Sequence, residues 1–188
     1  MKTAIILHGM PYKEEYFDPQ NPSQSNMHWI PWLQQELILR GVLAQTPEFP
    51  EPYEPDYKAW KMVFDQFHVD ENTILIGHSC GGGFLVRWLS ENNINVGQVI
   101  LAAPWLDPDI SLKNDMLRFE IDRDLVQKTA GVSVIVSTDD FPDIIASVDT
   151  IVATLPEVEY TQLTGLGHFT AQSMGRTDFP ELLSIISV

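Results

Sequence analysis

The sequence predicts a three-layer, doubly wound α/β fold, with a mostly parallel six-stranded sheet between two layers of helices. Short apolar runs alternate with stretches of helical periodicity about six times along the chain. These runs are continuously apolar, which is typical of strands in a sheet that is covered on both faces. Right-handed crossovers between parallel strands then distribute the intervening helices over the two faces.

Six runs are expected to form the strands because each is short, apolar and followed by glycine, proline or polar residues. They cover residues 3–7, 42–49, 73–76, 96–103, 132–136 and 158–163, of which 42–49 is the weakest. Each run is followed, directly or after a loop, by a stretch with helical spacing. This alternation is typical of repeated strand–helix–strand units.

The helices are predicted from apolar residues three and four positions apart. The stretches are 29–37, 57–67, 80–92, 122–129, 144–155 and a closing helix from Pro180. Asp56 is suited to cap the second helix, and Gly41 is suited to end the first. Residues 10–28 and 104–131 are otherwise irregular, and a loop of the length of 10–28 is usually functional or disordered in a compact domain, so whether the loop at 11–27 covers a binding site stays open.

The composition indicates one globular domain over residues 1–188, with 44% hydrophobic and 20% charged residues. A net charge of −15 argues against nucleic acids and anionic membrane surfaces as partners and favours neutral or cationic small molecules. The one cysteine cannot form an intramolecular disulfide, so we expect a reducing compartment, the cytoplasm. No apolar run has the length of a membrane span, and nothing indicates the oligomeric state.

Ligand sites of doubly wound sheets lie at the carboxyl ends of the strands. After the run at 73–76 the sequence reads Gly77-His78-Ser79-Cys80-Gly81, a G-x-S-x-G motif between a predicted strand and a predicted helix. This is the pattern of a nucleophile elbow, a sharp turn in which glycines allow the serine to adopt a strained backbone conformation. The candidate nucleophile is therefore Ser79, and an ordinary glycine-rich turn is the alternative.

A serine nucleophile needs a base, and His168 is the strongest candidate among the five histidines. It follows the last predicted strand, within Gly165-Leu166-Gly167-His168-Phe169. His78 is adjacent to the serine, but we expect the elbow to turn its side chain away. We also expect His68 to lie at the end of a surface helix.

An acid that orients the base is expected between the two, in the chain order Ser, Asp, His. Asp139 and Asp140 both follow the strand at 132–136, and the residue pattern leaves the choice between them open. The aspartate that is not the acid is expected to cap a helix or to be a solvated charge in the loop.

An oxyanion in such a site is held by two backbone amides. One is expected from Cys80, after the nucleophile, and the other from Met10, after the first strand. Cys80 is also a rival nucleophile, but its position beyond the elbow points the thiol elsewhere. His8 is expected to be structural, and Trp105 could line the pocket. No metal-binding spacing is present, and the chemistry requires no cofactor.

These residues resemble the small serine hydrolases of the retinoblastoma-binding protein 9 and YdeN type, within the α/β-hydrolase superfamily. The resemblance runs along nearly the whole chain. Its motifs are His8-Gly9, His28-Trp29 with Trp32-Leu33, Trp60, Gly77-His78-Ser79, Ala103-Pro104, Ser137-Thr138-Asp139-Asp140 and Gly167-His168-Phe169.

The resemblance implies a compact α/β-hydrolase fold without a lid domain, and it implies that Asp140 is the acid. Here Asp140 is followed by Phe141-Pro142-Asp143, an altered order of the family pattern, which keeps Asp139 as the alternative. The expected activity is cleavage of a small ester, like that of a carboxylesterase, through an acyl-enzyme at Ser79. A thioesterase, an amidase or peptidase with the same triad, and a protein-binding module on this fold are the alternatives.

Overall fold

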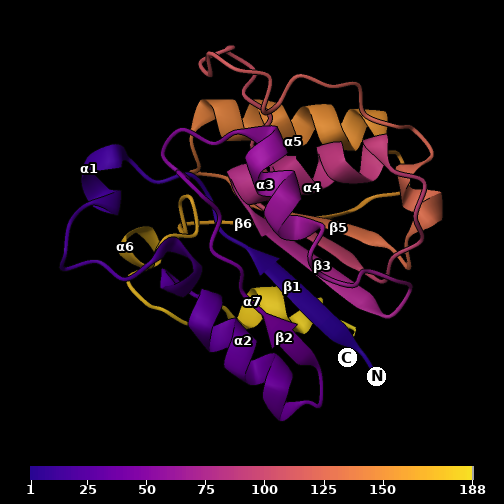
Figure 1. Cartoon of the computed structure of the whole chain (residues 1–188), viewed down its shortest axis with the longest axis horizontal. Coiled ribbons are helices and arrows are strands. Elements are labelled where there is room, and N and C mark those ends of the chain that lie inside the picture. Colours follow the sequence, from indigo (N-terminus) through magenta and orange to yellow (C-terminus); the bar gives the residue numbers. More distant parts are fainter. Residues whose placement is uncertain (188) are drawn as a thin grey trace.

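All six predicted strands are present in the computed structural model, and they form a single parallel sheet (Figure 1). The strand order is β2-β1-β3-β4-β5-β6. The strands are β1 (Thr3–Leu7), β2 (Leu43–Gln45), β3 (Thr73–His78), β4 (Val99–Ala102), β5 (Val132–Ser137) and β6 (Glu159–Leu163). The structure describes residues 1–187, so Val188, the last residue of the predicted domain, lies outside the described residues. The predicted α/β class is confirmed.

Helices cover both faces of the sheet, as predicted. Figure 1 shows α3, α4 and α5 on one side of the sheet and α2 and α7 on the other. The helices are α1 (Lys13–Tyr16), α2 (Ile30–Leu39), α3 (Tyr57–Phe64), α4 (Cys80–Glu91), α5 (Pro142–Thr154), α6 (Ala171–Met174) and α7 (Pro180–Ser184). Within residues 1–187, no helix is long and apolar enough to cross a membrane.

Burial explains why the central strands are continuously apolar. Every residue of β3, β4 and β5 is buried, since helices pack on both faces of these strands. The prediction of continuously buried strands is wrong at the two edges of the sheet. In β6 no residue is buried, and in β2 only Ala44 is buried, because an edge strand has a neighbour on one side only.

Three local predictions need correction. The strand predicted at 42–49 is limited to β2, because Pro47 has no N–H to donate and the Phe49 N–H bonds to the His8 ring instead. The helix predicted at 122–129 is one 3₁₀ turn, η2 (Leu125–Lys128). The segment predicted as a loop at 11–27 contains α1 and a second 3₁₀ turn, η1 (Gln24–Asn26).

The register brings the carboxyl ends of the strands together on one side of the molecule. Leu7 pairs with Gly77, His78 with Ala102, and Ser137 with Leu163. Residues that follow these strands therefore meet at the carboxyl ends of the strands, on the left of Figure 1, where α1 and α6 also lie.

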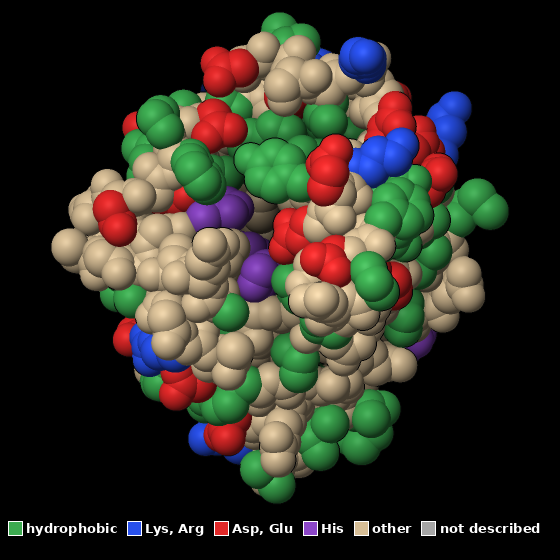
Figure 2. Space-filling model, turned by 90° about the vertical axis from the view of Figure 1, so that its left-hand side faces the viewer, with side chains coloured by type: hydrophobic (Ala, Val, Ile, Leu, Met, Phe, Trp, Pro, Cys, Tyr) green, Lys and Arg blue, Asp and Glu red, His purple; other side chains and the backbone are tan. Residues whose placement is uncertain are grey.

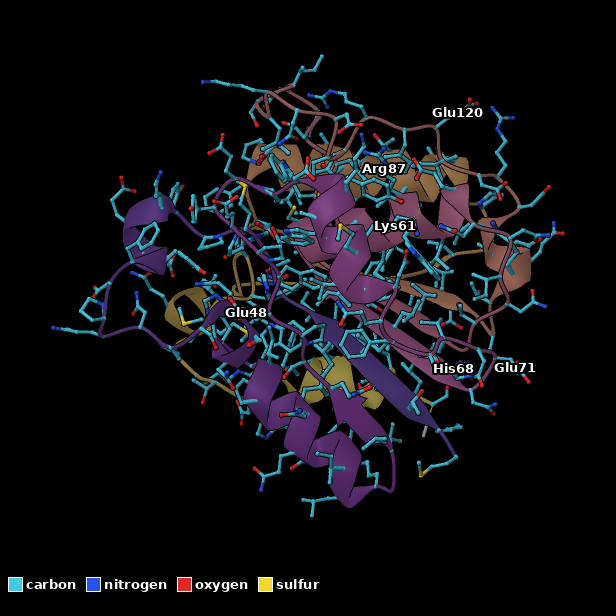
Figure 3. The ribbon with its side chains drawn as sticks, in the orientation of Figure 1. Glu48, Lys61, His68, Glu71, Arg87 and Glu120 are labelled. Carbon is cyan, nitrogen blue, oxygen red and sulfur yellow. The ribbon has the colours of Figure 1, made fainter. Side chains whose placement is uncertain are left out.

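A buried arginine of α4 holds the irregular segment 104–120 against that helix. Arg87, labelled in Figure 3, donates to the carbonyls of Asp115 and Met116 and pairs with Glu91 at 2.8 Å. Its guanidinium carbon also lies 3.6 Å from the centre of the Tyr57 ring, a cation–π contact. This segment is thus fixed without regular secondary structure of its own.

Candidate active site

Ser79 occupies the sharp turn between β3 and α4, with φ of 52° and ψ of −120°. A non-glycine residue in this region of φ and ψ is strained by about 1–3 kcal/mol, so the surrounding structure must hold it. The Ser79 N–H donates to the Ala102 carbonyl, and its own carbonyl accepts from Gly83 and Trp105, all at 3.0–3.1 Å. The structure therefore contains the strained elbow that the sequence predicts.

The glycines of the motif are required by close backbone approaches. A Cβ atom on Gly77 would lie 2.7 Å from the Gly81 carbonyl oxygen. A Cβ on Gly81 would overlap the His8 carbonyl, and one on Gly83 would overlap the Trp105 carbonyl. Helix α4 can therefore approach β1 and the segment after β4 only with glycine at these positions.

Three predicted side chains meet at this turn. The Nε2 atom of His168 lies 2.9 Å from Ser79 Oγ, and its Nδ1 lies 2.9 and 3.1 Å from the two Asp140 oxygens. A carboxylate only accepts hydrogen bonds, so Nδ1 carries the proton and Nε2 is free to accept from the serine hydroxyl. The Asp140 side chain is fully buried, whereas 16% of the His168 side chain is exposed. The arrangement can carry a proton from Ser79 to His168 while Asp140 faces the resulting cation.

The neighbouring aspartate points to the backbone of the loop that carries His168. Asp139 accepts from the Ser137 hydroxyl and from the N–H groups of Gly165 and Gly167. The Ser137 hydrogen bond is the main cause that holds the pKa of the Asp139 carboxyl below its ordinary value. The structure thus separates the two candidates: Asp140 contacts the imidazole and Asp139 holds the loop.

His8 orients the peptide that leads into Met10. Its Nε2 accepts from the Phe49 N–H at 3.0 Å, so its Nδ1 carries the proton and donates to the Gly9 carbonyl at 2.8 Å. In a trans peptide the Met10 N–H points opposite to that carbonyl. Within residues 1–187 neither the Met10 N–H nor the Cys80 N–H has a hydrogen-bond acceptor, so both are available to a ligand. Gly9 lies against the serine, since a Cβ there would be 3.0 Å from Ser79 Cβ.

Cys80 does not present a nucleophile. Its side chain is fully buried, and burial raises the pKa of the thiol, with a further contribution from Asp107. A buried, protonated thiol is a poor nucleophile. Within residues 1–187 no three His, Cys, Asp or Glu side chains are grouped so that they could hold a metal ion.

Two further histidines lie beside His168. Among the described residues the His78 side chain has no hydrogen bond to Ser79, but it lies beside the loop of His168: its ring centre is 5.0 Å from that of His168, and its Nε2 bonds the His168 carbonyl at 2.9 Å. His28 accepts from the Ala171 N–H at 3.2 Å and packs edge-on against His78. In the sequence His28 stands out only within the family motif, because a contact over 143 residues leaves no local signal.

The site opens on the face at the carboxyl ends of the strands. Figure 2 shows this face, with histidine side chains at the bottom of a hollow and acidic and hydrophobic side chains around it. Of the hydrophobic side chains that adjoin the site residues in sequence, Met10 is 37% and Phe141 is 60% exposed. Trp105 is buried, and its backbone N–H supports the elbow by donating to the Ser79 carbonyl.

The segment 11–27 lies on the same face. Glu48, labelled in Figure 3, accepts from the backbone N–H groups of Gln24 and Ser25 at 3.2 and 2.7 Å. His28 then connects the end of the segment to α6. Exposed Tyr12 and Phe17 stand on its outer part.

A parallel six-stranded sheet with a serine on a strained elbow defines the α/β-hydrolase fold. The model of the serine hydrolase family matches residues 20–187. The chain belongs to this family.

The similar proteins have the same fold over almost the whole chain. YdeN of Bacillus subtilis (strain 168), whose assignment as a hydrolase is provisional, is 26% identical over 200 residues, which cover 99% of this chain and 95% of YdeN. The crystal structure of the ydeN gene product has a TM-score of 0.83 at 23% identity and covers 98% of this chain and 96% of that one.

Two esterase structures are more distant. Est1E from Butyrivibrio proteoclasticus, with ferulic acid bound, has a TM-score of 0.60 at 15% identity, over 93% of this chain and 84% of its own. Esterase B from Lactobacillus rhamnosis, inhibited by a tributyrin phosphonate, has a TM-score of 0.57 at 14% identity, over 98% of this chain and 72% of its own.

Proposed function

We propose that the chain is a carboxylesterase-like serine hydrolase that cleaves small esters through Ser79, His168 and Asp140. The observation that carries the proposal is the continuous hydrogen-bonded relay from Ser79 Oγ through His168 to the buried Asp140 carboxylate, with both steps at 2.9 Å. Family membership supports a hydrolase, and the esterases among the similar structures support an ester as the substrate.

In the proposed reaction, Ser79 Oγ attacks the ester carbonyl while His168 Nε2 takes the hydroxyl proton. The carbonyl oxygen becomes an oxyanion, which the N–H groups of Met10 and Cys80 bind, and each donor contributes about 3 kcal/mol. His168 returns the proton to the leaving alkoxide, so an alcohol departs and the acyl group stays on Ser79. Water then repeats the sequence with His168 as the base, and the carboxylic acid is released.

Asp140 has two roles in this scheme. It fixes the Nδ1–H tautomer of His168, and it stabilises the imidazolium that forms in each half-reaction. The reaction needs no cofactor. The one cysteine, buried and unpaired, supports our proposal that the protein works in a reducing compartment, the cytoplasm.

A fluorophosphonate probe and a series of nitrophenyl esters of increasing acyl length test the proposal. We expect the probe to label Ser79 and short-chain esters to be cleaved, and Ser79→Ala to lose both properties with its fold unchanged. If the probe labels Ser79 but esters are not cleaved, and thioesters or amides are cleaved instead, the substrate is a thioester or an amide and not an ester. Folded wild-type protein that resists the probe would instead indicate a binding module.

A further inference from the structure

The loop that carries His168 has three residues with positive φ, and one of them is not glycine. Gly165, Gly167 and Phe169 have φ values of 75°, 52° and 54°. A bulky residue such as Phe169 is an outlier at positive φ. Contacts from outside the loop must therefore hold it in place, and through it the imidazole of His168.

His78 supplies the most direct of these contacts. Its Nε2 lies 2.9 Å from the backbone carbonyl of His168 itself. A carbonyl only accepts, so Nε2 of His78 carries a proton. His78 is 3% exposed, so this bond lies inside the protein.

His28 holds the far end of the same loop. Its Nδ1 accepts from the Ala171 N–H at 3.2 Å, so its proton also lies on Nε2. The ring centres of His28 and His78 are 5.9 Å apart, edge to face. The two histidines thus tie the His168 carbonyl to β3 and the Ala171 N–H, three residues further on, to the segment that ends at His28.

Burial favours the neutral form of both rings. It lowers the pKa of His28 to about 4, with a contribution from His168, and it lowers the pKa of His78 well below its ordinary value. The titratable groups that face His78 are His8, His28 and His168. A charged ring among these neighbours would be repelled as soon as His168 became an imidazolium.

We propose that His28 and His78 are positioning residues, two neutral imidazoles of fixed tautomer that hold the loop of His168 at its distance from Ser79. Neither ring touches the reacting atoms. The inference rests on the proposed function, since it concerns the base of that reaction. It predicts that each histidine is replaceable by a side chain that keeps its one hydrogen bond.

Paired amide substitutions test this prediction. The amide nitrogen of glutamine can take the place of Nε2, whereas the shorter asparagine amide takes the place of Nδ1. We expect His78→Gln to retain kcat within about threefold of wild type. We expect His78→Asn to lower kcat roughly 10–100-fold with KM unchanged, since a misplacement of about 1 Å costs about that much.

His28 reverses the pattern. His28→Asn keeps an acceptor near Ala171 and suits the positive φ of 59°, whereas His28→Gln does neither. We expect asparagine to retain activity and glutamine to lower kcat. The same two substitutions at His68, whose side chain is 88% exposed and which Figure 3 places far from the site, serve as the control.

The proposal is overturned if asparagine and glutamine have equal effects at His78 in proteins of equal thermal stability. If the wild type neither cleaves esters nor reacts with the fluorophosphonate, the proposed function fails by itself. In that case nitrogen-15 spectra of the histidine rings test the positioning role, because they report the tautomer of each ring without an activity measurement. An Nε2–H tautomer of both rings at pH 7 is expected, and an Nδ1–H tautomer or a charged ring would refute it.

Discussion

The imidazole of His168 is bonded through Nδ1 to both oxygens of Asp140, at 2.9 and 3.1 Å. Asp139, one residue earlier, bonds the backbone of the same loop instead. The two adjacent carboxylates thus have different partners: Asp140 contacts the imidazole of His168, and Asp139 contacts the backbone of the loop that carries it.

Substitution by asparagine should affect activity differently at Asp139 and at Asp140. We expect Asp140→Asn to lower kcat about 10⁴-fold, because asparagine can donate to Nδ1 and stabilise the wrong tautomer. Asp139→Asn keeps an oxygen that accepts from Gly165, so we expect less than about a tenfold loss. Steady-state hydrolysis of a nitrophenyl ester compares them, and a larger loss at Asp139 would reverse the assignment.

At Gly83, helix propensity and packing predict opposite effects of an alanine substitution on the free energy of unfolding. In a helix, alanine is favoured over glycine by about 0.5–1 kcal/mol. At Gly83, however, the new Cβ would overlap the Trp105 carbonyl, and overpacking costs about 1–3 kcal/mol or more. We therefore expect Gly83→Ala to lower the free energy of unfolding in urea and to weaken probe labelling at Ser79.

Gly175 is the control for this substitution. It has φ of 67°, and a Cβ atom there would have no neighbour within 4 Å, so Gly175→Ala meets backbone strain alone. We expect it to cost about 1 kcal/mol and to leave the labelling rate unchanged. If Gly83→Ala proved more stable than the wild type, the close approach of α4 to the segment after β4 would be refuted.

Removing the buried guanidinium of Arg87 should release the segment 104–120. Arg87→Met would leave the carbonyls of Asp115 and Met116 without their donor, and a buried acceptor without a partner costs about 1–3 kcal/mol. We expect a lower thermal midpoint and faster proteolysis within 107–118. Arg40→Met, which breaks an exposed pair with Glu36, should cost less than about 1 kcal/mol. Equal effects of the two substitutions would contradict the role of Arg87.

The stability of the protein should depend on pH through His28. Its pKa is about 4 in the folded chain against about 6.5 when unfolded, so the unfolded state binds more protons between these values. Stability is therefore full above about pH 6.5 and falls as the pH decreases toward 4. The loss attributable to His28 is about 3 kcal/mol, from the difference between the two pKa values.

Urea unfolding of the wild type and of His28→Asn between pH 4.5 and 7.5 measures this contribution. The variant keeps the bond to Ala171 but has no ring to titrate, so its stability should decrease less as the pH falls. His68→Asn removes an exposed imidazole and should follow the wild type. Parallel pH curves for the wild type and His28→Asn would show that His28 does not titrate in this way.

Much of the fold could be predicted because local physics determines it. Continuous apolar runs identify β1, β3, β4 and β5, since a strand covered on both faces has no polar side to show. At the edge of the sheet the pattern weakens, and β2 is shorter than the spacing predicted. The 3₁₀ turn η2, between β4 and β5, is also shorter than predicted. In β2 the reason is a hydrogen bond from Phe49 to His8, 41 residues away.

The sequence by itself determined the order of strands and helices, the glycine-flanked elbow at Ser79, and the place of His168 after the last strand. These depend on side-chain periodicity and on backbone sterics, which act within a few residues. Only the tertiary structure decided which of Asp139 and Asp140 faces His168, and that His28 and His78 hold its loop. These relationships join groups 28 to 143 residues apart, and burial, which selects their partners and their protonation states, is a property of the folded chain alone.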